Sequence, residues 1–114
     1  MRTIDRQTLK SLLDAGTVTV FEALPLEYYR KAHLPGARHL PHDAVEELAA
    51  QVLPDREAPI VAYCANAECP NSHIAAEALA RLGYSDVSVY VEGKKDWLEA
   101  GYPVESGKPA ALAA

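Results

Sequence analysis

The chain has 114 residues, 49% of them hydrophobic and 24% charged, which is typical of one globular domain and excludes a disordered or fibrous protein. Eleven Lys and Arg residues against sixteen Asp and Glu give a formal net charge of −5, and no basic cluster marks a nucleic-acid-binding surface. The sequence shows neither a signal-peptide pattern nor an apolar run of membrane-spanning length, so we expect a cytoplasmic protein with no membrane partner.

Capping residues and the spacing of apolar side chains predict the helices. In chain order they cover residues 5–15, with Asp5 or Thr8 as N-cap and Gly16 as the stop, 26–32 after Pro25, 44–53 after the cap Asp43, 70–82 before Gly83, and 93–100 before Gly101. Runs rich in β-branched and aromatic residues predict strands at 17–21, 59–64 and 87–91, with a short edge strand at 37–40. Trp97 and Leu98 are both expected to face the interior.

Strands that alternate with helices at short spacing predict an α/β fold, with an open, mostly parallel β-sheet and helices on both faces. Residues 1–105 are expected to form this single domain. Residues 106–114, rich in Ala with Gly and Pro, are expected to form a loosely ordered C-terminal tail. Ligands of such sheets bind beyond the carboxyl ends of the strands, and Cys64 lies at one of these ends.

Cys64 is the main candidate for a reactive residue. It closes the most apolar stretch of the chain and precedes a loop that leads into the N-terminus of the helix predicted at 70–82. We expect backbone N–H groups of the loop and the helix dipole to surround a sulfur anion and to lower the pKa of the Cys64 thiol. Asn71 and Ser72 either help close the loop through side-chain hydrogen bonds or are ordinary polar residues of the first helical turn. The loop residues assigned to this anion site are Ala65, Asn66, Ala67, Glu68, Pro70, Asn71 and Ser72.

Three segments in this order carry a family resemblance. They are His33-Leu34-Pro35-Gly36-Ala37, Tyr63-Cys64 with its loop, and the run from Gly93 through Trp97 and Gly101 to Pro103-Val104. From about residue 4 to 105 the chain resembles the rhodanese-like family of sulfurtransferase domains, in a single-domain form with a C-x4-C active-site loop. The resemblance implies a rhodanese-like α/β fold in which Cys64 accepts sulfane sulfur from thiosulfate or a thiol persulfide. The resulting persulfide passes its sulfur to a thiol or another nucleophile, and this chemistry requires no cofactor.

The active-site loop differs from the common form of the family. Seven residues separate Cys64 from Ser72, none of them basic, and Glu68 is acidic. Because Glu68 would repel a small dianion such as thiosulfate, we expect a low-molecular-weight thiol persulfide or a partner protein's persulfide as the donor. The sequence leaves the physiological acceptor and the oligomeric state open.

Cys69, the second thiol, has two interpretations. It is either a resolving thiol that attacks the persulfide on Cys64 and leaves a disulfide, or a small residue that a loop tolerates. A third pattern, Cys64, Cys69 and His73, resembles part of a metal site. Structural zinc needs four ligands and no fourth follows, so no metal is assigned.

Two other functions are weighed against sulfur transfer. The first is a non-enzymatic persulfide or redox sensor, or a sulfur carrier, that works through a Cys64–Cys69 disulfide. The second is a phosphatase or arsenate reductase with a C-x5-R loop, but position 70 is Pro70, so the cation that would clamp the phosphoryl group is missing.

Tyr28 and Tyr29 are adjacent and point in different directions, so one is expected to pack and the other to line the rim of the site. Glu22 is either a solvated carboxylate or a support for the loop.

Overall fold

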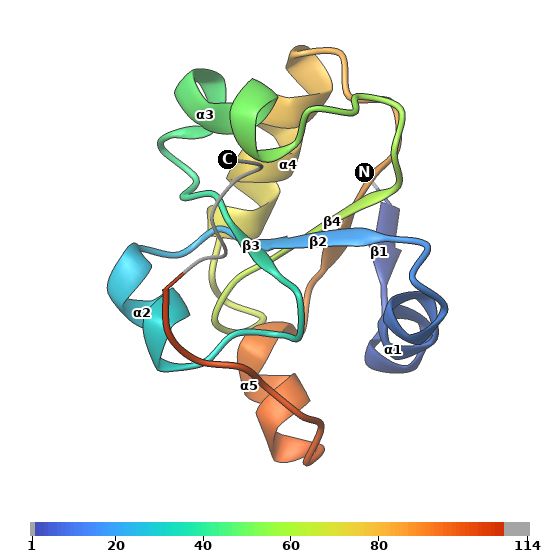
Figure 1. Cartoon of the computed structure of the whole chain (residues 1–114), viewed down its shortest axis with the longest axis vertical. Helices are drawn as coiled ribbons and strands as arrows, with labels where there is room; N and C mark the ends of the chain where they lie inside the picture. The colour runs from blue at the N-terminus through green and yellow to red at the C-terminus, as the bar shows by residue number, and fades with distance from the viewer. Residues whose placement is uncertain (1, 109–114) are drawn as a thin grey trace.

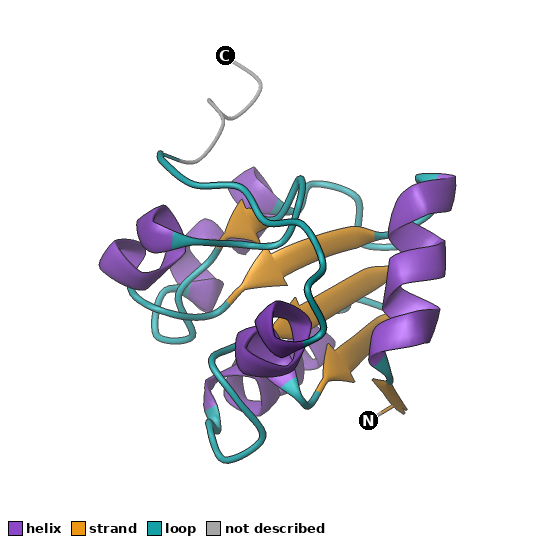
Figure 2. Cartoon of the chain, turned by 90° about the horizontal axis from the view of Figure 1, so that it is seen from below, coloured by secondary structure: helices purple, strands orange, loops and turns teal. Residues whose placement is uncertain are grey.

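The computed structural model describes residues 2–108 and contains one five-stranded sheet in the order β1-β5-β4-β2-β3. The strands are β1 (Arg2–Ile4), β2 (Thr19–Glu22), β3 (Arg38–His39), β4 (Ile60–Tyr63) and β5 (Val87–Tyr90). All neighbouring strands are parallel, so their carboxyl ends meet at one edge of the sheet (Figure 2). The predicted α/β class with a parallel sheet is confirmed.

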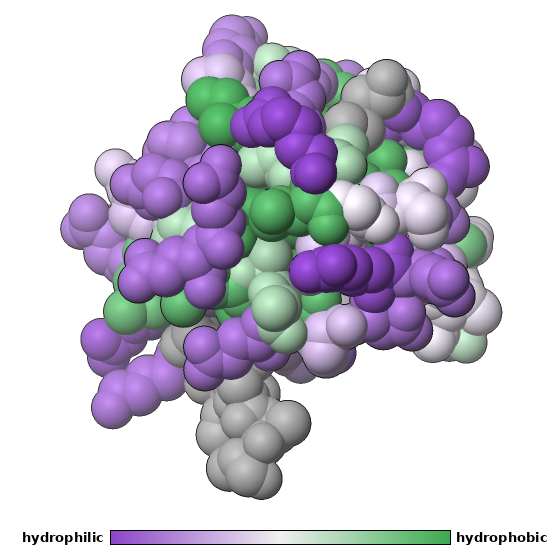
Figure 3. Space-filling model, turned by 90° about the horizontal axis from the view of Figure 1, so that it is seen from above, coloured by the Kyte–Doolittle hydropathy of each residue, from purple (hydrophilic) through white to green (hydrophobic). Residues whose placement is uncertain are grey.

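Five helices cover the two faces of the sheet. They are α1 (Arg6–Ala15), α2 (Leu26–Lys31), α3 (Val45–Val52), α4 (Asn71–Arg81) and α5 (Gly93–Glu99). Figure 1 shows α3 and α4 on one side of the sheet and α1, α2 and α5 on the other. The face that carries α3 and α4 is mostly hydrophilic on its outside, with apolar side chains exposed near its centre (Figure 3).

The central strand β4 is buried on both faces. Ile60 and Ala62 pack into the hydrophobic cluster beneath α3 and α4. Val61 and Tyr63 pack into the opposite cluster, which contains Trp97 of α5. Successive side chains of a strand point to opposite faces, so a strand between two helix layers must be apolar throughout. This explains the continuous apolar run that leads to Cys64.

Two of the predicted helix ends have the expected residues. The Oδ1 atom of Asp5 accepts a hydrogen bond from the backbone N–H of Thr8 at 2.8 Å, so Asp5 is the N-cap of α1. Gly16 ends α1 in the left-handed conformation, with φ of 70°. The cap predicted for α3 is wrong, because its N-cap is Ala44, which makes no side-chain cap hydrogen bond, and Asp43 lies one residue earlier.

Two further expectations are corrected. The short strand β1 was not predicted, because its three residues lack an apolar alternation and two of them are exposed; it is held at the sheet edge by parallel pairing with β5. Trp97 is fully buried, but its neighbour Leu98 is 46% exposed, so the prediction that both face inward is wrong for Leu98.

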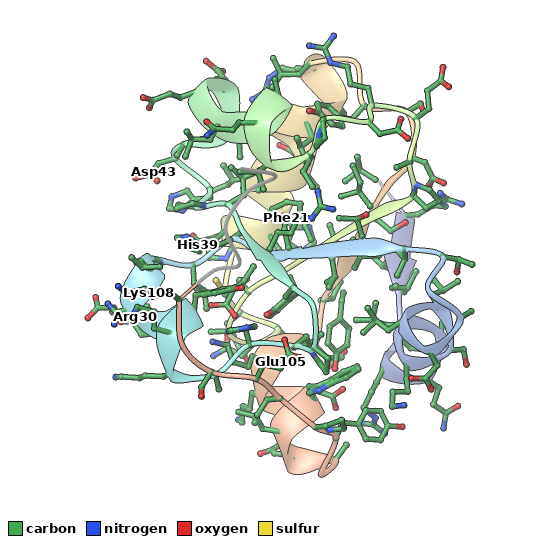
Figure 4. The ribbon with its side chains drawn as sticks, viewed as in Figure 1. Phe21, Arg30, His39, Asp43, Glu105 and Lys108 are labelled. Carbon is green, nitrogen blue, oxygen red and sulfur yellow. The ribbon has the colours of Figure 1, made fainter. Side chains whose placement is uncertain are left out.

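The segment after α5 returns across the molecule toward α2. Glu105 forms an antiparallel bridge with His33, and the N–H of Gly107 donates to the carbonyl of Arg30 at 2.8 Å. Figure 4 shows Glu105 and Lys108 on this segment, with Lys108 near Arg30 of α2. The rest of the predicted tail, residues 109–114, lies outside the described residues. Among residues 2–108, the longest apolar stretch in a helix falls short of what a bilayer crossing requires.

Candidate functional site

Cys64 lies directly after β4, at the carboxyl edge of the sheet, and is only 1% exposed. Its thiol, as a donor, lies 3.3 Å from the carbonyl oxygen of Cys69 and 3.4 Å from the hydroxyl oxygen of Ser72. Ser72 is a buried residue of the first turn of α4. The structure therefore brings the predicted nucleophile to the start of the helix, inside a closed loop.

The pKa of Cys64 does not move in the predicted direction. Burial raises the pKa of this thiol, and the neighbouring Cys69 thiol raises it further. The hydroxyl and backbone amide of Ser72 favour the thiolate, but they do not outweigh burial. The predicted lowering of the pKa is wrong because the sulfur is buried and lies beside the Cys69 thiol, and both effects favour the protonated form.

The loop is shaped by Asn66. Its Oδ1 atom accepts hydrogen bonds from the backbone N–H groups of Glu68 and Cys69, both at 3.1 Å. These two amides are therefore bonded within the loop and do not face the sulfur, which corrects the expectation of a ring of loop amides. Of the remaining loop residues, Ala65 is half-buried, Ala67 and Glu68 are exposed, Pro70 is the exposed N-cap of α4, and Asn71 is its half-buried first residue. The side chain that closes the loop is Asn66, and the predicted role of Asn71 has no counterpart in the hydrogen bonds of the described residues.

Cys69 is a free, half-buried thiol beside Cys64, and the two cysteines are not joined by a disulfide. The N-cap of α4 is Pro70, so Cys69 lies one residue before the N-cap position. Within residues 2–108 no three His, Cys, Asp or Glu side chains are grouped so that they could hold a metal ion. Cys64, Cys69 and His73 therefore do not form the partial metal site considered from the sequence.

The N-terminus of α5 holds the beginning of the loop. The N–H of Lys94 donates to the carbonyl of Cys64, and the N–H of Lys95 donates to the carbonyl of Ala65, both at 2.9 Å. Gly93 has φ of +72°, and a Cβ atom there would lie 2.6 Å from the carbonyl oxygen of Cys64. The close approach of the two backbones therefore requires glycine at position 93.

A buried ion pair fixes α5 against the sheet. The Nζ atom of Lys94 lies 3.0 Å from Oε1 and 3.1 Å from Oε2 of Glu22, whose side chain is fully buried at the end of β2. The same ammonium donates to the carbonyls of Tyr28 at 3.0 Å and Ala32 at 2.6 Å. Glu22 is thus a buried support of the site and not a solvated carboxylate.

Tyr63 connects this ion pair to the turn after α2. Its hydroxyl donates to Oε1 of Glu22 at 2.8 Å and accepts a hydrogen bond from the N–H of Leu34 at 3.1 Å. Burial, followed by the charge of Glu22, raises the pKa of Tyr63 well above its ordinary value. His33 stacks on Tyr29 with ring centroids 3.8 Å apart, and its Nδ1 lies 2.8 Å from the Tyr29 carbonyl, so His33 is a packing and hydrogen-bonding residue of this turn.

The role of Lys94 as a buried partner of Glu22 was not predicted from the sequence. The separation of Lys94 and Glu22 in the chain is 72 residues, and their pairing depends on how β2 and α5 meet in space. The one local signal was that Lys94 follows Gly93 at the start of a helix with a buried tryptophan. That position is equally compatible with an exposed lysine, so the signal was weak.

A groove of about 460 Å³ adjoins the loop between α2 and α5. Its lining consists of Leu24, Tyr28, Lys31, Ala32, Ala65, Lys94, Lys95, Leu98 and Glu99. Tyr28 lies on its rim and is 48% exposed, whereas Tyr29 is buried, as expected for this adjacent pair. The lining of the groove includes Ala65, the residue that follows Cys64.

We expect Gly93→Ala to destabilise the protein more than Gly83→Ala. Both glycines have positive φ, and a left-handed alanine costs about 1–2 kcal/mol at either position. Only at Gly93 would the new methyl group also collide with the backbone of Cys64, because a Cβ at Gly83 meets nothing within 4 Å. Urea unfolding of both variants measures the loss in the free energy of unfolding. Equal losses would mean that the backbone of α5 at Gly93 is not in close contact with the backbone of Cys64.

We expect the alkylation rate of Cys64 to keep rising with pH beyond the ordinary thiol pKa of about 8.5. The reason is that only the thiolate reacts and the raised pKa delays its formation. The measurement uses iodoacetamide and the Cys69→Ser variant, in which Cys64 is the single thiol and burial, the largest cause of the raised pKa, is retained. Urea-unfolded protein is the control. A rate that reaches its plateau below about pH 8 would contradict this assignment.

Comparisons with known proteins agree on one family. The model of the rhodanese-like domain matches residues 5–100. The HTH-type transcriptional regulator Rv0324 of Mycobacterium tuberculosis is 35% identical over 106 residues, which make up 93% of this chain and 46% of that protein. The putative sulfur carrier protein YrkF of Bacillus subtilis is 27% identical over 95 residues, covering 82% of this chain and 49% of that protein.

The human single-domain sulfurtransferase TSTD1 has the same fold, with a TM-score of 0.76 and 27% identity, over 87% of this chain and 96% of that one. This chain spans about half the length of the two curated relatives. Because the family model covers most of the chain and includes Cys64, the chain belongs to the family of rhodanese-like domains.

Proposed function

We propose that this domain is a sulfurtransferase that accepts sulfane sulfur on Cys64 and passes it to a thiol. The observation that carries the proposal is the position of Cys64, at the carboxyl edge of the sheet and against the first turn of α4, in a rhodanese-like domain. The sulfurtransferase TSTD1 and the sulfur carrier YrkF among its relatives support a role in sulfur transfer.

In the first half-reaction the sulfur of Cys64 attacks the outer sulfur of a thiol persulfide, RSSH. A new S–S bond forms on Cys64 while the S–S bond of the donor breaks, and the proton of the Cys64 thiol ends on the leaving thiol, RSH. In the second half-reaction an acceptor thiol attacks the outer sulfur of the Cys64 persulfide. The acceptor becomes the persulfide, and Cys64 returns to the thiol.

The loop must rearrange for Cys64 to react. In the closed loop the Cys69 carbonyl accepts a hydrogen bond from the thiol at 3.3 Å, and this oxygen would repel a thiolate. When the carbonyl turns away, the hydroxyl and amide of Ser72 remain as donors to the sulfur anion at the start of α4. Ala67 and Glu68 are exposed, so the outer part of the loop can move without disturbing the core.

Cys69 supplies a second route in this proposal. Its thiol attacks the inner sulfur of the Cys64 persulfide, which forms a Cys64–Cys69 disulfide and releases H₂S. Two equivalents of an external thiol then reduce the disulfide and are themselves oxidised to a disulfide. The proximity of the two thiols favours this step.

We expect incubation with glutathione persulfide to add the mass of one sulfur atom to the protein, and Cys64→Ser to abolish this gain. Cys69→Ser is the matched control, because it keeps the accepting thiol and loses only the internal disulfide. Intact-protein mass spectrometry with peptide mapping reads both results. Sulfur loaded on Cys69 in the Cys64→Ser variant would refute the proposal. So would the absence of a sulfur gain from both glutathione persulfide and thiosulfate in Cys69→Ser, which cannot release the sulfur through the internal disulfide.

One finding favours a second function, a persulfide-sensing module. A relative with 35% identity is an HTH-type transcriptional regulator, of which this chain covers 46%. In this alternative, loading of Cys64 and formation of the Cys64–Cys69 disulfide change the loop and report the presence of persulfide. Repeated turnover with excess donor and acceptor separates the two: many turnovers favour the transferase, and a single loading event favours the sensor.

A further inference from the structure

We propose that the groove between α2 and α5 binds the body of a low-molecular-weight thiol persulfide that carries a carboxylate. The carboxylate lies at Lys31 and Lys95, and the sulfur end of the donor points toward Ala65 and Cys64. This inference rests on the proposed sulfur transfer and specifies the class of donor.

The groove is lined by the residue that follows Cys64 and by a residue bonded to it. Ala65, which lines it, directly follows Cys64 in the chain. Lys94 also lines it, and the backbone N–H of Lys94 is bonded to the Cys64 carbonyl at 2.9 Å. A molecule in this groove therefore lies beside the loop that has to open. Only the sulfur end of the donor then needs to reach Cys64 beneath the loop.

The walls of the groove are apolar and exposed. Tyr28 of α2 and Leu98 of α5 are 48% and 46% exposed, and both line the groove together with Leu24. Large exposed apolar side chains that converge on one concave surface are typical of a ligand site, whereas isolated ones are ordinary surface features. The apolar carbons of a small thiol would cover these side chains.

The charge of the groove is opposite to that of the whole protein. Lys31 and Lys95 are exposed, and neither forms an ion pair with another residue in the range 2–108. Lys94 is neutralised by Glu22, so the two remaining lysines face a single acidic lining residue, Glu99. This leaves a net charge of +1 in a chain whose formal charge is −5.

The lysines compensate for the missing cation of the active-site loop. The loop holds Glu68 and no basic residue, so it cannot bind an anionic donor through a side chain of its own. The ammonium of Lys31 lies 5.9 Å from the ring centroid of Tyr28, which places this charge at the groove wall. A donor with a carboxylate some distance from its sulfur would satisfy the lysines and keep its negative charge away from Glu68.

The size of the groove favours a small molecule over a protein. Its volume of about 460 Å³ falls within the roughly 300–1,000 Å³ of small-molecule sites. A stable protein interface needs about 800 Å² on each partner, which extends well beyond a groove of this kind.

The test measures single-turnover loading of Cys64 with glutathione persulfide and with its diethyl ester, in which both carboxylates are neutralised. The proteins are the wild type, the double variant Lys31→Met/Lys95→Met, and Arg81→Gln. Arg81 is an exposed cation at the far end of α4, so its variant removes a charge of the same sign away from the groove.

We expect the double variant to have a higher half-saturating concentration of the acid donor, by about two- to fivefold for each lysine lost, with an unchanged limiting rate. The ester should bind the wild type as weakly as the acid binds the double variant. The half-saturating concentration of the ester should be the same for the wild type and the double variant. Equal effects on acid and ester, no effect, or an effect only on loading from a persulfidated protein would overturn the groove assignment and leave the sulfur transfer intact. Failure of every donor to load Cys64 would instead refute the proposed function.

Discussion

The buried ion pair between Lys94 and Glu22 is the contact on which the arrangement around Cys64 depends. It joins the end of β2 to the start of α5, two elements that are far apart in the chain. Two buried charges are stable only when nearby groups complete their hydrogen bonds, and here the Tyr63 hydroxyl and the carbonyls of Tyr28 and Ala32 do so. Removal of one partner of such a pair typically costs about 3–5 kcal/mol. The pair thus keeps α5 where its first amides meet the active-site loop.

This support divides the loop into a fixed part and a movable part. The carbonyls of Cys64 and Ala65 are bonded to α5, whereas Ala67 and Glu68 are exposed and held only through Asn66. The bonds to α5 therefore hold the backbone at Cys64 and Ala65, and the exposed residues Ala67 and Glu68 lie outside this support. Burial raises the pKa of the Cys64 thiol and so disfavours the thiolate, which is the form that reacts with oxidants.

The α/β class could be predicted from the sequence because the signals for its helices and strands are local. The apolar run before Cys64, the cap Asp5 and the stop Gly16 each determine a nearby element, and the alternation of these elements implies a parallel sheet. Strand β1 could not be predicted, since three mostly exposed residues carry no pattern and pair only because β5 offers an open edge. The direction of the pKa shift of Cys64 also could not be predicted, because it depends on how deeply the thiol is buried and on its contact with the Cys69 thiol. The position of Cys64 at the end of a strand was thus predictable from the sequence, and the environment of its thiol was not.

Hydrogen exchange at the first amides of α5 tests the central claim most directly. The first N–H groups of a helix have no acceptor within the helix, so their protection reports an external bond. The account predicts that the amides of Lys94 and Lys95 exchange as slowly as those of β4, because they bind the carbonyls of Cys64 and Ala65. The first-turn amide of Glu46 in α3 is the reference, since residues 2–108 supply it with no such acceptor. Exchange of Lys94 and Lys95 as fast as that of Glu46 would contradict the account, because α5 would then not hold the loop.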